Sequence, residues 1–393
     1  MDLKVGIIGF GLRASLHRYL QRPNEGSVVS IVCDTSERGR QDAAEALPDA
    51  VVTGDLQELL DFELDAVLVL TPDYTHRNVV VRTLKSGIPT FVEKPLDITL
   101  EAADEILDTA RRTGTRLYVG HNMRHMPVIR QMKQLVDSGT IGEVKAVWCR
   151  HFVGNGGDYY FKDWHAQQRY ANTLLLQKGA HDIDVIHWLA GGYSTQVSGV
   201  GALAVYGDVT DRRDNSDLRM RDWFSLSNWP PAKQTQLNPE LDVEDLSMVQ
   251  MKLDNGVLAS YQQCHFTPDY WRNYTVIGSA GRLENFGDGP GDFIHVWNTR
   301  STHGFAEPDL KVEVNGDDEG HGGADPNLIA EFLRFAREGG ATDTSPVAAR
   351  AAVAVGDYGA RSMRAEGEAL QIPALDGQLA EYFAANQQAA AVS

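Results

Sequence analysis

The sequence predicts an α/β protein. Its N-terminal part is predicted to form a doubly wound parallel sheet, and its C-terminal part an α+β domain with a mainly antiparallel sheet. Three observations lead to this prediction. An apolar strand pattern runs directly into a glycine-rich turn, strand and helix patterns alternate over the first 120 residues, and later segments have a period of two. We expect domains at residues 1–122 and 123–393.

The composition is that of a globular protein. The 393 residues are 42% hydrophobic and 23% charged, and no apolar run approaches the roughly 20 residues that cross a bilayer. The N-terminus has no signal-peptide pattern, so we expect a cytoplasmic protein. The net charge of −18 disfavours nucleic acid and anionic membranes, and favours a small-molecule partner. Cys33, Cys149 and Cys264 are far apart, so we predict neither a disulfide framework nor a metal site.

The glycine-rich turn follows the predicted strand KVGIIGF. Its spacing is Gly9-x-Gly11-x-x-Ala14, followed by the predicted helix RASLHRYLQ. In a dinucleotide-binding turn the first glycine permits the bend, the second lets the backbone approach a pyrophosphate, and a small third residue lets helix pack on strand. The helix N-terminus would then face the phosphates. The glycine spacing alone also fits an ordinary turn.

The second predicted strand, SVVSIVCD, ends in Asp34, 25 residues after Gly9. An acidic residue at this distance typically binds the adenosine ribose hydroxyls, which favours NAD over NADP. Arg38 and Arg40 could instead hold a 2′-phosphate. Asp34 could also simply cap the next helix.

Strands and helices continue to alternate, with helices expected over residues 36–47, 55–61, 75–86 and 99–113. The segments TPDYTH at 71–76 and EKP at 93–95 come where strands end. Open α/β sheets bind ligands at the carboxyl ends of their strands.

Four segments together resemble the glucose-fructose oxidoreductase/inositol dehydrogenase/rhizopine catabolism family. They are the glycine turn, Thr71-Pro72 with His76, Glu93-Lys94-Pro95, and GAHDIDVIHWL at 179–189. The resemblance implies an N-terminal Rossmann domain that binds NAD and a C-terminal domain whose large open sheet is often buried in a homodimer or homotetramer. It also implies that the bond before Pro95 is cis. The cofactor contacts that we expect are Gly9, Gly11, Ala14, Asp34, Thr71, Pro72, His76, Glu93, Lys94 and Asn122.

Lys94 and His181 are the predicted catalytic residues. A lysine at a strand end beside a positively charged nicotinamide has a depressed pKa and can relay the hydroxyl proton while a hydride leaves the carbinol carbon. In the family a histidine at the position of His181 contacts the substrate hydroxyl, and Asp184 matches a structural aspartate. An exposed lysine and a structural histidine are the alternatives.

Gln177 departs from the family pattern. Many sugar and inositol dehydrogenases carry an aspartate there, and glutamine can orient a substrate but cannot exchange a proton. Simple dehydrogenation is therefore in doubt. The nearby candidates for a replacement acid or base are Tyr159, Tyr160, His165, Tyr170 and Lys178.

Residues 145–178 are locally basic. Lys145, Arg150, Lys162, Arg169 and Lys178 stand there against Asp158 and Asp163. This pattern suits an anionic substrate, or a solvated rim. Trp164 could stack on a sugar or pack in the core, and Asn122 and Arg124 could bind nicotinamide or substrate. The predicted substrate-binding residues are Arg124, Arg150, Tyr160, Lys162, Trp164, Gln177, Lys178 and His181.

The second half of the chain is predicted to contain strand pairs at 245–266, with an Asn255-Gly256 turn, and at 270–287. Residues 207–240 fit a long loop or lid, or an irregular oligomer contact. Helices are expected at 326–339 and 347–364, and the last helices could pack back on the first domain. We expect the tail after Tyr382 to be frayed or arm-like.

These observations support an NAD-dependent oxidoreductase that abstracts hydride from a ring hydroxyl of a sugar or glycoside, with an anionic substrate favoured. The alternative is an NAD-dependent, redox-neutral glycosidase that oxidises C3 transiently, eliminates the aglycone and adds water, for example on a sulfoquinovoside. A third hypothesis, a non-catalytic NAD-binding regulator, would require a DNA-binding helix pair or a basic extension, and the sequence shows neither.

Overall fold

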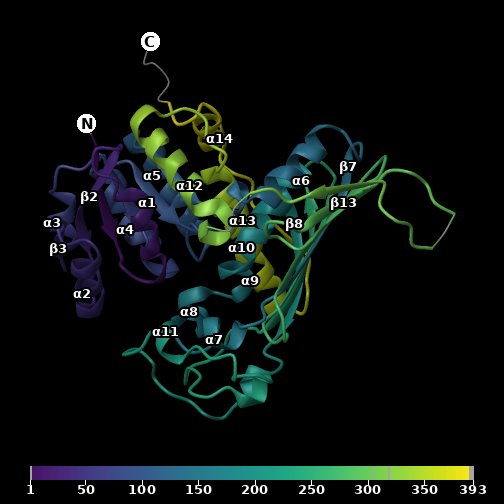
Figure 1. The fold of residues 1–393 in the computed structure, drawn as a ribbon, viewed down its shortest axis with the longest axis horizontal. Coiled ribbons are helices and arrows are strands. Elements are labelled where there is room, and N and C mark those ends of the chain that lie inside the picture. Colours follow the sequence, from purple (N-terminus) through teal and green to yellow (C-terminus); the bar gives the residue numbers. More distant parts are fainter. Residues whose placement is uncertain (1, 303, 317–318, 389–393) are drawn as a thin grey trace. The chain divides into compact units, whose positions relative to one another are not determined.

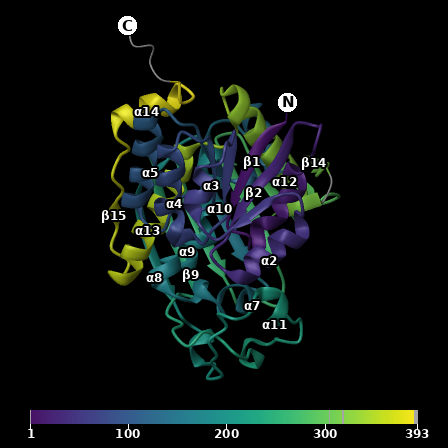
Figure 2. The same ribbon diagram turned by 90° about the vertical axis from the view of Figure 1, so that its left-hand side faces the viewer.

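The computed structural model describes residues 2–302, 304–316 and 319–388, and it divides into two compact units. The first unit comprises Met1–His125, Glu319–Arg350 and Leu375–Ser393, and the second comprises Met126–Asp318 and Ala351–Ala374. Figure 1 labels their elements, and Figure 2 shows the same elements after a quarter turn. Among the described residues, no helix is both long and apolar enough to cross a membrane.

The first unit contains a six-stranded parallel sheet with the order β3-β2-β1-β4-β5-β6. The strands are β1 (Leu3–Ile8), β2 (Ser27–Cys33), β3 (Val51–Thr53), β4 (Ala66–Val69), β5 (Thr90–Glu93) and β6 (Leu117–Gly120). Every residue of β4, β5 and β6 is buried, as expected for a sheet covered on both faces. The predicted doubly wound sheet is confirmed.

The crossover helices begin at side-chain caps. Ser36, Asp55 and Thr99 accept hydrogen bonds from backbone N–H groups in the first turns of α2, α3 and α5. The crossover helices are α2 (Glu37–Ala46), α3 (Leu56–Leu60), α4 (His76–Lys85) and α5 (Leu100–Thr113). Helices α4 and α5 lie side by side (Figures 1 and 2).

The first predicted helix differs from the expectation. In place of a regular helix over 13–21, the chain forms a 3₁₀ helix, η1 (Leu12–Leu16), followed by a single α turn, α1 (His17–Leu20). Gln21 leaves the helical conformation, with ψ +78°, and its side-chain oxygen accepts from Val29 N of β2 at 2.9 Å.

The C-terminal helices α12 (Glu319–Glu338) and α14 (Gly377–Ala384) belong to the first unit. In Figure 1 the yellow-green α12 lies beside the purple N-terminal elements. Leu328, Phe332 and Phe335 of α12 enter the core, where the Phe332 ring lies 5.4 Å from Phe91 of β5. The start of α12 is kinked, because Gly320–Gly323 all have left-handed torsion angles.

The tail after Tyr382 is not frayed up to residue 388. Helix α14 continues to Ala384, and the side-chain amide of Gln387 pairs with both the N–H and the carbonyl of Leu117 in β6, at 2.8 Å each. This amide satisfies backbone groups on the edge strand of the sheet. Residues 389–393, which the prediction also covered, lie outside the described residues.

The second unit is built on a nine-stranded sheet with the order β14-β13-β12-β11-β7-β10-β9-β8-β15. Only β7 and β10 pair in parallel; the other neighbours are antiparallel. The predicted Asn255-Gly256 turn joins β9 to β10, with Gly256 at φ +84°. The strands are β7 (Val144–Phe152), β8 (Ser194–Ala202), β9 (Leu246–Leu253), β10 (Leu258–Cys264), β11 (Trp271–Gly278), β12 (Arg282–Phe286), β13 (Phe293–Trp297), β14 (Leu310–Glu313) and β15 (Leu370–Gln371).

One face of this sheet packs against α10, and the opposite face carries exposed apolar side chains. Gly179, the first residue of α10, allows close packing, because a Cβ there would lie 2.9 Å from the Tyr261 ring of β10. Trp148, Met248 and Leu258 on the opposite face are exposed. The helices are α6 (Pro127–Asp137), α7 (Gly156–Tyr160), α8 (Gln168–Ala171), α9 (Leu174–Gln177), α10 (Gly179–Ala190), α11 (Met220–Trp223) and α13 (Pro346–Arg364), whose first turn belongs to the first unit.

Residues 207–240 form a packed segment with short helical turns. Asp245, wholly buried, accepts hydrogen bonds from the N–H groups of Ala204, Val205 and Tyr206 at 2.7–2.8 Å and so fixes the start of the segment. Leu237 lies in a core cluster with Phe161, Leu174, Tyr206 and Val243. The predicted long loop is therefore present, packed against the core and interrupted by short helical turns, whereas its role as a lid or as an oligomer contact stays a prediction.

We predict that Asp245→Asn lowers the free energy of unfolding by about 3 kcal/mol, because an amide cannot accept three backbone hydrogen bonds in the same geometry. Urea unfolding would measure the loss, and limited proteolysis would locate new cleavage in residues 204–243. The exposed Asp208→Asn is the control and should change neither. Wild-type stability in Asp245→Asn would contradict the anchoring role.

Candidate functional site

The glycine turn has the shape of a cradle for a dinucleotide. Gly9 has φ +89°, and a Cβ there would lie 3.0 Å from the backbone of Leu70 at the end of β4. A Cβ at Gly11 would meet no atom within 4 Å, so the backbone of Gly11 is open to a ligand. Ala14 is buried, as expected for the third residue of the pattern. These three residues fit a bound pyrophosphate.

Asp34 connects the glycine turn to the end of β2. Its Oδ2 accepts from Phe10 N at 2.7 Å, and its Oδ1 accepts from Ser36 N and Ser36 Oγ, both at 2.7 Å. Ser36, and not Asp34, caps α2. A carboxylate has about four acceptor positions, so three bonds leave room for a ribose hydroxyl. Arg40 is engaged elsewhere, since its guanidinium donates to the carbonyls of Asp34 and Thr35 at 2.9 Å.

His76 joins the two loops that follow β4 and β5. The ring is wholly buried, with Nε2 2.9 Å from Thr71 O and Nδ1 2.8 Å from Pro95 O. The Lys94–Pro95 peptide is cis, as the resemblance implied. His76 is therefore placed to support the loops of Thr71 and Lys94 from behind. Both nitrogens face backbone carbonyls, which supports this positioning role, and the predicted cofactor contact of His76 stays a prediction.

Glu93, the last residue of β5, is held by a residue that the sequence analysis did not single out. Arg13 Nε donates to Glu93 Oε1 at 2.7 Å, and the same guanidinium pairs with Asp325 at the start of α12. Arg13 stands inside the glycine pattern, so its position could have drawn attention. Asp325 is 312 residues away, and no pattern in the sequence indicates the pairing.

Asn122 and Arg124, which follow β6, have different environments. Asn122 is buried, and its Oδ1 has no hydrogen-bond partner among the described residues. A buried acceptor of this kind fits an amide donor such as the nicotinamide carboxamide. Arg124 is also buried, and its NH1 donates to Asp343 O at 2.8 Å within the first unit. Arg124 is thus engaged inside the first unit, and its predicted substrate contact stays a prediction.

In the second unit, Gln177 and His181 share one side of a helical segment. The Thr173 side chain caps α9, Gln177 ends it, and Lys178 joins it to α10 with helical torsion angles. Residues four apart on such a segment are neighbours. Burial lowers the pKa of His151 and His265, and the nearby charge of Lys178 adds to the effect.

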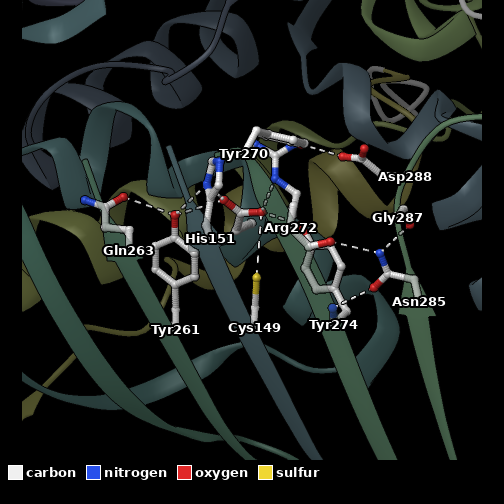
Figure 3. A network of polar contacts seen from close by, with 11 residues as sticks. Cys149, His151, Tyr261, Gln263, Tyr270, Arg272, Tyr274, Asn285, Gly287 and Asp288 are labelled. Atoms are coloured by element: carbon white, nitrogen blue, oxygen red, sulfur yellow. Dashed lines mark hydrogen bonds and ion pairs between the residues drawn. The ribbon is translucent and has the colours of Figure 1, made fainter. Parts of the chain in front are cut away.

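Asp182, the residue after His181, is wholly buried and binds side chains of the sheet, and Figure 3 labels these partners in a polar network. Oδ2 lies 3.0 Å from His151 Nδ1 and accepts from Tyr261 OH at 2.9 Å. Oδ1 accepts from Tyr274 OH and forms an ion pair with Arg272 Nε at 3.0 Å. The network ties the first turn of α10, and with it His181, to strands β7, β10 and β11. The sequence analysis singled out Asp184 and missed Asp182.

Burial controls the charges in this network. It is the main cause that lowers the pKa of His151 to about 3, and the nearby Arg272 cation adds to it. Burial opposes the charged form of Asp182, but Arg272 and His151 outweigh it and hold the pKa of Asp182 below its usual range. Near neutral pH the network thus contains an Asp182–Arg272 ion pair and a neutral His151.

Arg150 lies on the other face of β7 from Cys149 and His151. Its side chain is half-exposed and its NH2 donates to Asn273 Oδ1 at 3.0 Å. Successive side chains of a strand point to opposite faces, so Arg150 lies away from α10 and His181. Its predicted substrate contact is corrected accordingly.

The remaining basic residues of 145–178 do not gather at one place. Lys162 is buried with its Nζ 3.5 Å from Asp158 Oδ1, and burial lowers its pKa. Lys145 pairs with Glu143 at 2.7 Å, and Arg169 pairs with Glu240. Lys162 is thus paired inside the second unit, and the dispersal of these cations gives no support to an anionic substrate.

Tyr160 and Trp164 do come together, around His165. The His165 ring stacks on Trp164 with centroids 3.7 Å apart, and it meets Tyr160 edge-on at 5.5 Å. His165 Nδ1 lies 2.6 Å from Asp163 Oδ1, which orients the ring. Tyr160, Trp164 and His165 thus form one partly buried aromatic group.

Two buried polar residues near this group were not predicted. His265 meets the Tyr160 ring edge-on at 5.2 Å, and neither of its ring nitrogens has a partner among the described residues. Gln263 Nε2 likewise has none there. The period-two pattern of β10 placed Tyr261, Gln263 and His265 on one face and could have identified them. In the described part of the chain, no group of three or more His, Cys, Asp or Glu side chains could hold a metal ion.

We predict that acid destabilises the protein through His151. The unfolded histidine has a pKa near ~6.5 and the folded one about 3, so the unfolded chain binds more protons between these values. Stability from this group is complete above about pH 7 and falls by about 1.4 kcal/mol per pH unit below ~6.5. Between pH 6.5 and 4.5, the free energy of unfolding measured with urea should fall as the pH falls. His151→Gln should reduce this slope by the equivalent of one proton.

His17→Gln serves as the control for this titration, because His17 lies in the first unit and outside the network. Because His17 lies outside the network, the part of the slope that comes from His151 should remain in this variant. An equal slope in His151→Gln and the wild type would contradict a neutral, buried His151.

Two family models match the chain. One, described as the oxidoreductase family with an NAD-binding Rossmann fold, matches residues 3–121, and the other, the GFO/IDH/MocA C-terminal domain, matches residues 129–284. The putative oxidoreductase YteT of Bacillus subtilis is 26% identical over 307 residues, which are 68% of this chain and 72% of YteT.

Two other relatives match shorter stretches. A 2,7-anhydro-N-acetylneuraminate hydratase of Mediterraneibacter gnavus is 29% identical over 57% of this chain and 62% of its own length. Inositol 2-dehydrogenase 2 of Saccharopolyspora erythraea is 33% identical over 49% of this chain and 55% of its own. These matches span about half to three-fifths of the relatives.

Among solved structures, levoglucosan dehydrogenase in complex with NADH and levoglucosan has a TM-score of 0.75, with 95% of this chain and 100% of that chain covered. At 19% identity, this similarity bears on the fold alone. The two family models describe the same family, and together they match most of the chain. This result agrees with the family resemblance seen in the four sequence segments. The chain therefore belongs to the GFO/IDH/MocA family of NAD-binding oxidoreductases.

Proposed function

We propose that this protein is an NAD-dependent oxidoreductase that removes hydride from a ring carbinol of a sugar or glycoside. The observation that carries the proposal is the environment of Lys94 in the first unit. Lys94 follows β5, its backbone N–H donates to Glu93 Oε2 at 3.0 Å, and its loop is supported by His76. A lysine whose backbone is held at the carboxyl end of an interior strand is suited to proton transfer.

Gly9, Gly11, Ala14, Asp34 and Asn122 are the residues that would hold the dinucleotide, which supplies the hydride acceptor when bound. We propose a preference for NAD over NADP. The Asp34 carboxylate would repel a 2′-phosphate, and Arg40 already donates to two backbone carbonyls.

In this proposal Lys94 accepts the hydroxyl proton of the substrate. His181 and Gln177, neighbours on one helical segment, donate to or accept from substrate hydroxyls. Tyr160 and Trp164 supply a stacking face. The relatives named as inositol dehydrogenases support a polyol or sugar substrate. We propose no preference for an anionic substrate, because the basic residues of 145–178 are dispersed.

A redox-neutral reaction is the second candidate. Gln177 stands where many dehydrogenases carry an acid, and a hydratase is among the relatives. A glycosidase of this type returns the hydride to the substrate after elimination and water addition, so it would release aglycone with catalytic NAD.

We predict that Lys94→Ala lowers kcat by about 10²–10⁴-fold and leaves NAD binding within about threefold, because the lysine moves a proton and does not hold the dinucleotide alone. Turnover would be followed on neutral and anionic sugars and nitrophenyl glycosides, recording NADH and aglycone together. NADH in step with oxidation indicates a dehydrogenase, and many aglycones per NAD indicate the glycosidase. Full turnover by Lys94→Ala would refute the assignment.

We also propose that a second copy of the chain covers the open face of the nine-stranded sheet. Trp148 is 50% exposed and Leu258 58% exposed on that face, an amount of apolar surface that favours association. We predict a homodimer or homotetramer by light scattering. Trp148→Glu should yield smaller species, whereas Val51→Glu, at an equally exposed site in the first unit, should not. A monomeric wild type would exclude this interface.

A further inference from the structure

Arg13 belongs to the glycine turn, yet its side chain points into the protein. It stands two residues after Gly11 in η1, and only 19% of its side chain is exposed. Its guanidinium contacts two carboxylates, Glu93 and Asp325, whose side chains are almost completely buried. The first unit thus contains a buried cation between two buried anions, all of them outside the residues assigned to substrate.

The contact with Glu93 leads directly to Lys94. Arg13 Nε donates to Glu93 Oε1 at 2.7 Å, and Glu93 Oε2 accepts from Lys94 N at 3.0 Å. The two oxygens of one carboxylate therefore connect the glycine turn to the backbone of the proposed proton acceptor. Each of these bonds involves a charged group, and such bonds are shorter and stronger than neutral ones.

The contact with Asp325 fixes the other side of the guanidinium. NH1 and NH2 donate to Oδ2 and Oδ1 at 3.0 Å each, a bidentate pairing that sets the plane of the guanidinium. Asp325 also contacts His321 Nδ1 at 2.8 Å. Burial opposes the charge of Asp325, but His321 and Arg13 outweigh it and keep the pKa of Asp325 below its usual range. Arg13 thus has little freedom to leave Glu93.

We propose that Arg13 is a positioning residue that sets both the placement and the ionisation of Lys94 through Glu93. This inference rests on the proposed role of Lys94. Arg13 compensates the charge of Glu93, which would otherwise favour the protonated form of the neighbouring lysine and weaken it as a proton acceptor. Because Arg13 belongs to the glycine turn, it also makes the dinucleotide cradle and the Lys94 loop one rigid piece.

A purely structural ion pair is the alternative, and the sign of the effect on Lys94 distinguishes the two. Arg13→Gln leaves Glu93 uncompensated and should raise the pKa of Lys94. Glu93→Gln removes the negative charge and should lower it. A loss of packing or stability alone gives no reason for opposite shifts. Arg18→Gln, an exposed arginine one turn later, is the matched control.

The first experiment measures Lys94 directly, without substrate or cofactor. Competitive acetylation across pH, followed by mass spectrometry of the peptide that contains Lys94, gives the midpoint of its titration in the full-length protein. We expect Arg13→Gln to raise the midpoint by about half a unit to one unit, Glu93→Gln to lower it by a similar amount, and Arg18→Gln to leave it unchanged. Midpoints that are unchanged, or that shift in the same direction in both variants, overturn the proposal.

The second experiment uses Arg13→Lys, which keeps the positive charge. A lysine cannot pair with both oxygens of Asp325 and also contact Glu93. We expect a wild-type titration midpoint for Lys94, a kcat at least tenfold lower, and a KM and an NAD affinity within about threefold. Wild-type kcat in this variant overturns the positioning role. If Arg13→Gln does not fold, as judged by circular dichroism and thermal unfolding, Arg13→Lys and Glu93→Gln still decide the question.

The two readouts separate this inference from the proposed function. Labelling of Lys94 needs no turnover, so the opposite shifts can appear in a protein that oxidises none of the carbohydrates tested. That result would support the control of Lys94 by Arg13 and count against the proposed reaction. Turnover with unshifted midpoints would leave the reaction standing and reject the role of Arg13.

Discussion

Carboxylates shielded from water hold the functional loops of this protein in place. A buried negative charge is costly unless donors surround it, so each such group fixes the segments that supply its donors. Asp182 gathers side chains from three strands, Asp245 gathers three consecutive backbone N–H groups, and Asp325 holds the guanidinium of Arg13. Loops attached in this way keep their geometry despite a lack of regular structure.

The same constraint shows how the proposed catalytic side chains are placed. Lys94 and His181 are each adjacent in sequence to a buried carboxylate, Glu93 and Asp182 respectively. Glu93 and Asp182 are each bound to the interior of their own unit. Because side chains of adjacent residues on a strand or helix point in different directions, Lys94 and His181 point elsewhere. A fixed acid also sets the local charge beside it, and Arg13 and Arg272 are the cations that pair with these two acids.

Sequence position alone does not tell which side of an element a residue occupies. The basic residues of 145–178 are close in the chain, but Arg150 points to the outer face of β7 and Lys162 points into the core. Alternation along β7 would have separated Arg150 from His151. No pattern in the sequence would have joined Arg13 to Asp325, since that pair depends on α12 returning to the first sheet.

The sequence by itself determined the parallel sheet, most of its helices, the glycine turn with Asp34, and the family, because these depend on local periodicity and on short motifs at strand ends. Only the tertiary structure decided which polar groups are buried together. It placed Asp182 rather than Asp184 at the centre of a network, gave His76 a supporting role, and packed Gln387 on the edge of the first sheet. Contacts of this kind join residues far apart in the chain, and the energetic need to pair a buried charge or backbone group is met only once the chain has folded.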